Sequence, residues 1–162
     1  MHDSLLQNGP RRPLYTPAER ARRDASRWTL VQGILAPAQF LVCALSAILV
    51  LRCLLTGEGY ALATASVLLK TALLYTIMVT GAIWEKEVFG QYLFAPAFFW
   101  EDVVSFGVIA LHTLYIVGLL TGAMAPEQLL SLALLAYAAY AVNAVQFLWK
   151  LRRARLDAGG RA

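Results

Sequence analysis

Four of the chain's ten carboxylates lie in one short segment, which begins with Trp84 and ends with Asp102. The four are Glu85, Glu87, Glu101 and Asp102. The residues between them, Phe89 to Phe99, are too apolar for open water, so the segment is predicted to form a re-entrant or interfacial flap at a membrane surface. A carboxyl at the edge of such a flap is partly desolvated, which raises its pKa and lets it donate a proton near neutral pH. The segment is therefore a candidate site of acid–base chemistry.

The same segment has a simpler interpretation. Its aromatic residues, Trp84, Tyr92 and Trp100, are typical of the belt found where a membrane protein meets the lipid headgroups. In that case the neighbouring acids are solvated surface charges with no chemical role. The residues alone leave both interpretations open.

The elements that must position this segment are long apolar helices. Hydrophobic residues make up 59% of the chain and charged residues 15%, well below the roughly 25% charged residues of an ordinary soluble domain. Apolar runs cover residues 30–51, 61–83, 103–120 and 129–149, each close to the ~20 residues that a helix needs to cross the hydrocarbon. The prediction is an all-α integral membrane protein with four transmembrane helices.

A short juxtamembrane helix is predicted ahead of the first span. The string Thr16-Pro17-Ala18-Glu19 has the form of a capping box with proline at the first helical position. At this chain length one domain is expected, and it runs from residue 16 to residue 157 and contains the four spans. Residues 1–15 and 158–162 are predicted to be flexible tails.

Basic residues gather at both ends of the chain. Six of the fourteen Lys and Arg residues precede Trp28, and five follow Trp149. Four spans place both termini, and the segment from Trp84 to Asp102, on one side of the membrane. The positive-inside rule makes that side cytoplasmic, since the short turns around Glu58 and Glu127 hold no Lys or Arg. We expect a multi-pass protein of the cytoplasmic (inner or intracytoplasmic) membrane, whose positive charge serves orientation and lipid contact and not nucleic acid.

Polar residues inside the predicted spans are further candidates. At 100° per residue, Glu101, Ser105, His112 and Tyr115 lie within about 80° of one another on the third span. This polar face must point into the bundle or a cavity. Lys70 lies near the middle of the second span, where a charged residue is a functional candidate by default. Hydrogen bonding between helices would account for the polar face as well, and a polar neighbour would account for Lys70.

No cofactor or protein-bound metal is predicted. Cys43 and Cys53 lie on one helix, about 15 Å apart along its axis, so they cannot form a disulfide with each other. No Cys/His cluster indicates a zinc or iron–sulfur site. His112 is the only histidine inside the predicted spans, which argues against bis-histidine haem ligation. A single imidazole could still ligate a metal that a substrate carries.

Two strings are too specific for generic membrane helices. They are Trp84-Glu85-Lys86-Glu87-Val88-Phe89-Gly90 and Phe98-Phe99-Trp100-Glu101-Asp102. With them, roughly residues 15 to 157 closely resemble the 3-vinyl bacteriochlorophyllide hydratases of phototrophic bacteria.

The resemblance implies a lyase of bacteriochlorophyll synthesis. Such an enzyme adds water across the C3 vinyl group of chlorophyllide a or a related bacteriochlorin, giving the 3-(1-hydroxyethyl) pigment. Protonation of the terminal vinyl carbon leaves a cation that the conjugated macrocycle stabilises, and water then adds to it. One acid and one base suffice, without a redox cofactor. A pigment that partitions into the bilayer also explains why so small an enzyme is embedded in a membrane.

For this reaction, the expected acid and base are two of the four carboxyls named first. Glu101 is the first choice as acid, because it continues onto the polar face of the third span. The expected substrate-binding residues are His112, as a ligand of the substrate's magnesium, Trp84, Tyr92 and Trp100, as stacking partners of its ring, and Lys70. The alternative is a non-enzymatic chlorin-binding or pigment-assembly protein, which uses His112 and the aromatic rings only to hold the pigment. Because a bundle of four helices is thin, a homo-oligomer or a pathway partner is also expected.

Overall fold

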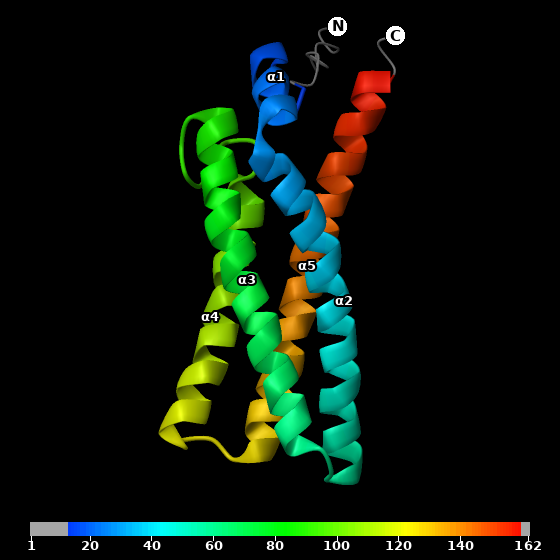
Figure 1. Cartoon of the computed structure of the whole chain (residues 1–162), viewed down its shortest axis with the longest axis vertical. Helices are drawn as coiled ribbons and strands as arrows, with labels where there is room; N and C mark the ends of the chain where they lie inside the picture. Colours follow the sequence, from blue (N-terminus) through cyan, green and yellow to red (C-terminus); the bar gives the residue numbers. More distant parts are fainter. Residues whose placement is uncertain (1–12, 160–162) are drawn as a thin grey trace, which may run out of the picture.

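The computed structural model describes residues 13–159, within which the chain forms five helices (Figure 1). They are α1 (Pro17–Ala25), α2 (Arg27–Thr56), α3 (Tyr60–Phe89), α4 (Phe99–Thr121) and α5 (Pro126–Gly159). The four long helices run up and down beside one another as a bundle, and α1 lies at one end of it. The predicted fold class is confirmed.

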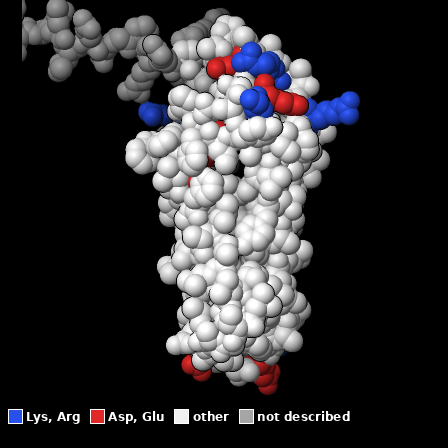
Figure 2. Space-filling model, turned by 90° about the vertical axis from the view of Figure 1, so that its left-hand side faces the viewer, with Lys and Arg blue, Asp and Glu red and all other residues white. Residues whose placement is uncertain are grey.

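The four long helices are apolar enough and long enough to cross a membrane. With 30 residues each, α2 and α3 extend for about 45 Å, more than the ~30 Å of the hydrocarbon core. They are longer than the predicted spans, because an apolar run marks the part of a helix that crosses hydrocarbon and not the residues where the helix ends. On the face seen in Figure 2, charged side chains gather toward the two ends and leave a wide uncharged band between them.

Local sequence signals set the helix boundaries. The Glu19 N–H donates to Thr16 Oγ1 over 3.2 Å, and the Thr16 N–H donates to Glu19 Oε2 over 2.7 Å, so the predicted capping box does begin α1. At the end of α3, Gly90 adopts a φ of +86° and donates its N–H to the Lys86 carbonyl, a left-handed cap that suits glycine. Gly90 also begins the irregular segment 90–98, which leads back into α4.

The helices pack mainly as two pairs, α2 against α3 and α4 against α5. Fully buried side chains such as Val67 and Val108 form the apolar core between them. Lys70 is also fully buried. It donates to Gln39 Oε1 over 2.8 Å, and its Nζ lies 3.8 Å from the centroid of the Tyr140 ring. The structure thus gives Lys70 the polar neighbour that the packing interpretation requires.

The chain already packs against the bundle ahead of α1. Tyr15 is buried, and its ring stacks on Phe89 at a centroid distance of 5.8 Å. This burial raises the pKa of the Tyr15 phenol above its ordinary value. In α1, Arg22 Nε donates to the Val88 carbonyl over 2.8 Å and so fixes α1 to the end of α3.

The predicted tails differ from the structure at their inner limits. The ordered fold begins before residue 16, as Tyr15 shows, and α5 continues to Gly159. The remaining residues of the two predicted tails, 1–12 and 160–162, lie outside the described part of the chain.

Both ends of the described chain lie at the same end of the bundle as segment 90–98 (Figure 1). We call this the terminal end. The α2–α3 and α4–α5 turns lie at the opposite end. This is the arrangement that an even number of spans requires, and it brings the first turn of α4 beside the C-terminal half of α5.

Candidate active site

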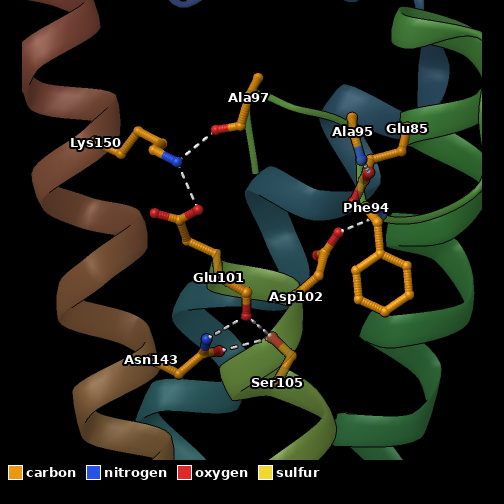
Figure 3. A network of polar contacts seen from close by, with 9 residues as sticks. All are labelled: Glu85, Phe94, Ala95, Ala97, Glu101, Asp102, Ser105, Asn143 and Lys150. Carbon is orange, nitrogen blue, oxygen red and sulfur yellow. Dashed lines mark hydrogen bonds and ion pairs between the residues drawn. The ribbon is translucent and has the colours of Figure 1, made fainter. Parts of the chain in front are cut away.

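Glu101 lies in the first turn of α4, at the terminal end, and is 6% exposed. Its Oε2 lies 2.5 Å from Nζ of Lys150 on α5. The same ammonium group donates to the carbonyl of Ala97, in the loop before α4 (Figure 3). Burying a carboxylate without a partner is costly, so the ion pair explains how this acid can lie inside the protein.

The main chain of Glu101 is also bound to α5. Its carbonyl accepts hydrogen bonds from Asn143 Nδ2 at 2.9 Å and from Ser105 Oγ at 2.8 Å. Ser105 Oγ in addition lies 3.1 Å from Asn143 Oδ1. Asn143 and Lys150 are seven residues apart, two helical turns, and therefore project from the same face of α5. One face of α5 thus fixes both the backbone and the carboxyl of Glu101.

Glu85 and Asp102 form a pair of neighbouring carboxyls, the Glu85–Asp102 pair, between the end of α3 and the start of α4. They are 5% and 4% exposed, and their carboxyls face each other. The Ala95 N–H donates to Glu85 Oε2 over 3.2 Å, and the Phe94 N–H donates to Asp102 Oδ2 over 2.8 Å (Figure 3). Like charges this close repel each other, and the two peptide N–H groups offset part of the repulsion.

These bonds hold the loop in a constrained shape. Phe94 adopts a φ of +60°, a value that a bulky residue rarely takes. Its ring stacks on Phe106 of α4 at a centroid distance of 5.4 Å. The Glu85–Asp102 pair therefore fixes segment 90–98 onto the ends of α3 and α4.

A groove with a volume of about 750 Å³ runs along α5 near the terminal end. Its α5 face consists of Ala141, Val142, Val145, Gln146, Trp149, Lys150, Arg153 and Ala154, and Leu14 and Glu101 complete the lining. We call this the α5 groove. It is open to the surroundings of the bundle, since Val145 is 58% and Trp149 64% exposed. Its volume lies in the range of roughly 300–1,000 Å³ that is usual for small-molecule sites.

The four predicted carboxyls therefore occupy three different environments. Glu101 lines the α5 groove. Glu85 and Asp102 contact the backbone of segment 90–98 and do not line the groove. Glu87, on α3, is exposed. Its carboxyl accepts a hydrogen bond from Oγ of Ser26, which lies at the α1–α2 junction.

The three predicted stacking residues also lie away from the α5 groove. Trp84 packs edge-on against Phe89 and Phe98, and its indole N–H donates to Thr29 Oγ1 over 2.9 Å. Tyr92 and Trp100 are 60% and 68% exposed. Their positions suit contact with lipid headgroups at the terminal end.

His112 lies inside the bundle and not in the groove. It is 1% exposed, and its Nδ1 lies 2.8 Å from the Val108 carbonyl. Its Nε2 is buried with no partner among the described residues. A chlorin could reach this nitrogen only if the helices separated. Among the side chains that the structure describes, no three of His, Cys, Asp or Glu come together as around a metal ion.

Sequence reasoning did not select Trp149, Lys150 or Asn143 for the site, and it interpreted most polar residues of the fourth span as packing groups. A signal was present, because Asn143 and Lys150 share one face of the fourth apolar run. However, basic and aromatic residues at the end of a span are ordinarily interfacial. The sequence could not show that this face of α5 meets Glu101.

Comparisons with known proteins agree along nearly the whole chain. Residues 15–153 match the family model described as 2-vinyl bacteriochlorophyllide hydratase. A protein of that name from Cereibacter sphaeroides is 73% identical over 148 residues, which cover 91% of this chain and 92% of the relative. Another of that name, from Rhodobacter capsulatus, is 68% identical over 152 residues, which cover 94% and 88%. No solved structure matches the chain.

Proposed function

The chain belongs to the 2-vinyl bacteriochlorophyllide hydratase family, and we propose that its α5 groove holds the pigment while Glu101 transfers the protons of the reaction. The chain is a hydratase of bacteriochlorophyll biosynthesis that acts on vinyl bacteriochlorophyllide and water. Position 2 in the family's name is C3 in systematic macrocycle numbering. The substrate proposed here is chlorophyllide a or a related bacteriochlorin with its vinyl group at that carbon.

The proposal rests on one observation. Among the described residues that line the α5 groove, Glu101 alone carries a carboxyl group. The rest of the lining suits a flat, largely apolar macrocycle, because Val142 and Val145 provide an apolar wall and Trp149 an aromatic face. The groove opens toward the region that lipid occupies. A pigment dissolved in the bilayer can therefore enter from the side.

The hydration proceeds in two steps. Glu101 donates its proton to the terminal vinyl carbon, and the π electrons form the new C–H bond. This leaves a cation at the carbon attached to the macrocycle, which the conjugated ring and the nearby Glu101 carboxylate stabilise. Water then forms the C–O bond, and its surplus proton returns to Glu101. The net change is the addition of one water, and the acid is regenerated.

Lys150 supplies the proton that Glu101 needs at the start. Before the pigment binds, the two side chains form an ion pair 2.5 Å long. A macrocycle in the groove excludes water from this pair, and a dry, apolar environment favours two neutral groups over two charged ones. The proton therefore passes from the Lys150 ammonium to the Glu101 carboxylate, and the carboxylic acid is formed only when substrate is present.

The terminal end of the bundle is proposed to face the cytoplasm. Most Lys and Arg residues of the described chain lie near this end, on α1, at the start of α2 and on the last turns of α5, whereas Arg52 lies near the other end of α2. Basic residues next to membrane spans are retained on the cytoplasmic side. The α5 groove would then lie in the cytoplasmic half of the bilayer.

The variant Glu101→Gln tests the proposal. Membranes that contain the protein are incubated with chlorophyllide a, and the product is identified by a mass increase of one water and a blue shift of the red absorption band. The amide keeps the shape of the side chain but cannot donate the proton, so the rate should fall by about 10²- to 10⁴-fold. Glu87→Gln, an equal change at an exposed position outside the groove, should keep the wild-type rate. Full activity in Glu101→Gln would exclude Glu101 as the acid.

A further inference from the structure

The α5 groove holds a second cationic residue besides Lys150. Arg153 lines the groove one turn beyond Trp149 and Lys150, close to the end of α5. We propose that Arg153 binds the propionate carboxylate of the pigment and so determines which edge of the macrocycle reaches Glu101. This inference rests on the proposed function of the groove, and it names the group that the groove recognises.

The two cations differ in their availability. The Lys150 ammonium is already shared between the Glu101 carboxylate and the Ala97 carbonyl. Among the side chains that the structure describes, no carboxylate forms an ion pair with Arg153. Arg153 is exposed and lines the groove, so its guanidinium is accessible to an anion that enters there.

The position of Arg153 matches the polarity of the substrate. A chlorophyllide has one polar end, because its propionate is a free carboxylate, and a broad apolar ring system. Val142, Val145 and Trp149 precede Arg153 on the same face of α5, so the groove passes from an apolar part to a basic rim. A guanidinium near the end of the helix can pair with the carboxylate at headgroup level while the ring stays in the apolar part.

Two anchored points fix the orientation of a flat molecule. The propionate at Arg153 and the ring against Trp149 leave a single edge of the macrocycle facing Glu101. Lys150, which holds Glu101, precedes Arg153 by three residues, about 4.5 Å along the helix axis. Glu101 and Arg153 line the same groove, so a pigment that lies in it can present its vinyl group to one and its carboxylate to the other. Arg153 is thus a specificity-determining residue, and the favoured substrate is the free acid.

The test measures pigment binding and turnover with two substrates that differ in one charge, chlorophyllide a and its propionate methyl ester. Both are titrated into the purified full-length protein by fluorescence to give a Kd, and KM and kcat are measured alongside. The variants are Arg153→Gln, Arg153→Lys and Arg152→Gln. Arg152 is the matched control, because it is an exposed arginine next in sequence that does not line the groove.

The wild-type protein should bind the free acid more tightly than the ester by roughly three- to tenfold, the range of a partly exposed charge-assisted pair. In Arg153→Gln this preference should disappear, with the Kd and KM of the free acid rising to the values of the ester. Arg153→Lys should keep part of the preference, and Arg152→Gln should keep all of it.

A preference that persists in Arg153→Gln would overturn the inference, as would equal binding of acid and ester by the wild-type protein. These outcomes are separable from a failure of the proposed catalytic role. Unimpaired hydration by Glu101→Gln would reject Glu101 as the acid, while the binding comparison would still report on Arg153. Conversely, an inactive Glu101→Gln variant together with an Arg153→Gln variant that still prefers the acid would reject only Arg153.

Discussion

Replacement of Lys150 by arginine separates the structural role of this residue from its chemical role. Both side chains carry a positive charge and can pair with Glu101. They differ in acidity, because a guanidinium does not give up its proton in a protein, whereas a lysine ammonium can when it is desolvated. If Lys150 passes a proton to Glu101, Lys150→Arg should keep the ion pair but lose the reaction.

The magnitudes follow from the contacts. In Lys150→Met, the Glu101 carboxylate, whose side chain is 8% exposed, loses its cation, and the Ala97 carbonyl loses a donor. Breaking a buried ion pair costs about 3–5 kcal/mol, and the lower end applies because the Lys150 side chain is 27% exposed. The free energy of unfolding should therefore fall by about 3 kcal/mol. In the double variant Lys150→Met/Glu101→Gln no carboxylate is left unpaired, so about half of that loss should be recovered.

The assay combines stability with turnover. Unfolding of the purified protein in detergent gives the first quantity, hydration of chlorophyllide a gives the second, and a fluorescence titration shows whether the pigment still binds. Lys150→Arg should unfold within about 1 kcal/mol of the wild-type protein and bind the pigment, yet turn over at least about a hundredfold more slowly. Arg152→Met, at an exposed position, should change neither quantity. Wild-type turnover by Lys150→Arg would refute the proton transfer, and a stable Lys150→Met variant would refute the structural role of the pair.

Three further predictions concern the groove, its support and its orientation. Trp149→Ala should weaken pigment binding about tenfold, since an aromatic contact contributes about 1 kcal/mol in addition to the effect of its buried area. The control Trp100→Ala should leave the Kd unchanged. Equal effects of the two variants in a fluorescence titration would contradict the placement of the pigment macrocycle against Trp149. Asn143→Leu removes two hydrogen bonds that join α5 to α4, so it should lower the free energy of unfolding by about 1–3 kcal/mol. Ser131→Ala is the control and should have little effect, because it loses only a hydrogen bond within α5. In Glu58→Cys, the new thiol should react with a membrane-impermeant reagent from the periplasmic side of intact cells. In Arg155→Cys, it should react only after lysis. The reverse pattern would invert the proposed topology.

The architecture could be predicted from the sequence because hydrophobic length is a local property. Each apolar run is close to the length that spans a bilayer, and an even number of runs brings the termini together. Helical phasing was equally informative on α4, where Glu101, Ser105, His112 and Tyr115 are all buried, as expected for a polar face that points into the bundle. The exact helix ends were less predictable, because residues beyond an apolar run can continue the helix until a glycine such as Gly90 ends it.

The partners of these residues could not be predicted, because they depend on how each helix is rotated against its neighbours. The carboxyls of Glu85, Glu101 and Asp102 are close in sequence or in space, yet only one of them lines the groove. The difference arises because the peptide N–H groups of Phe94 and Ala95 turn two of the carboxyls toward the loop. No periodicity in the sequence encodes where an irregular segment directs its N–H groups.

The rotation of α5 links all parts of the proposed site. Asn143 holds the carbonyl of Glu101, and this contact sets which face of α5 meets α4. The same rotation brings Lys150 to the Glu101 carboxyl and leaves Trp149 and Arg153 along the open groove. In the proposed mechanism, a single helix face therefore supports the acid, supplies its proton, and offers an aromatic surface and a cation to the pigment. On this proposal a bundle of four helices can present a complete binding surface, because substrate and acid would meet along one helix and need no enclosed cavity between them.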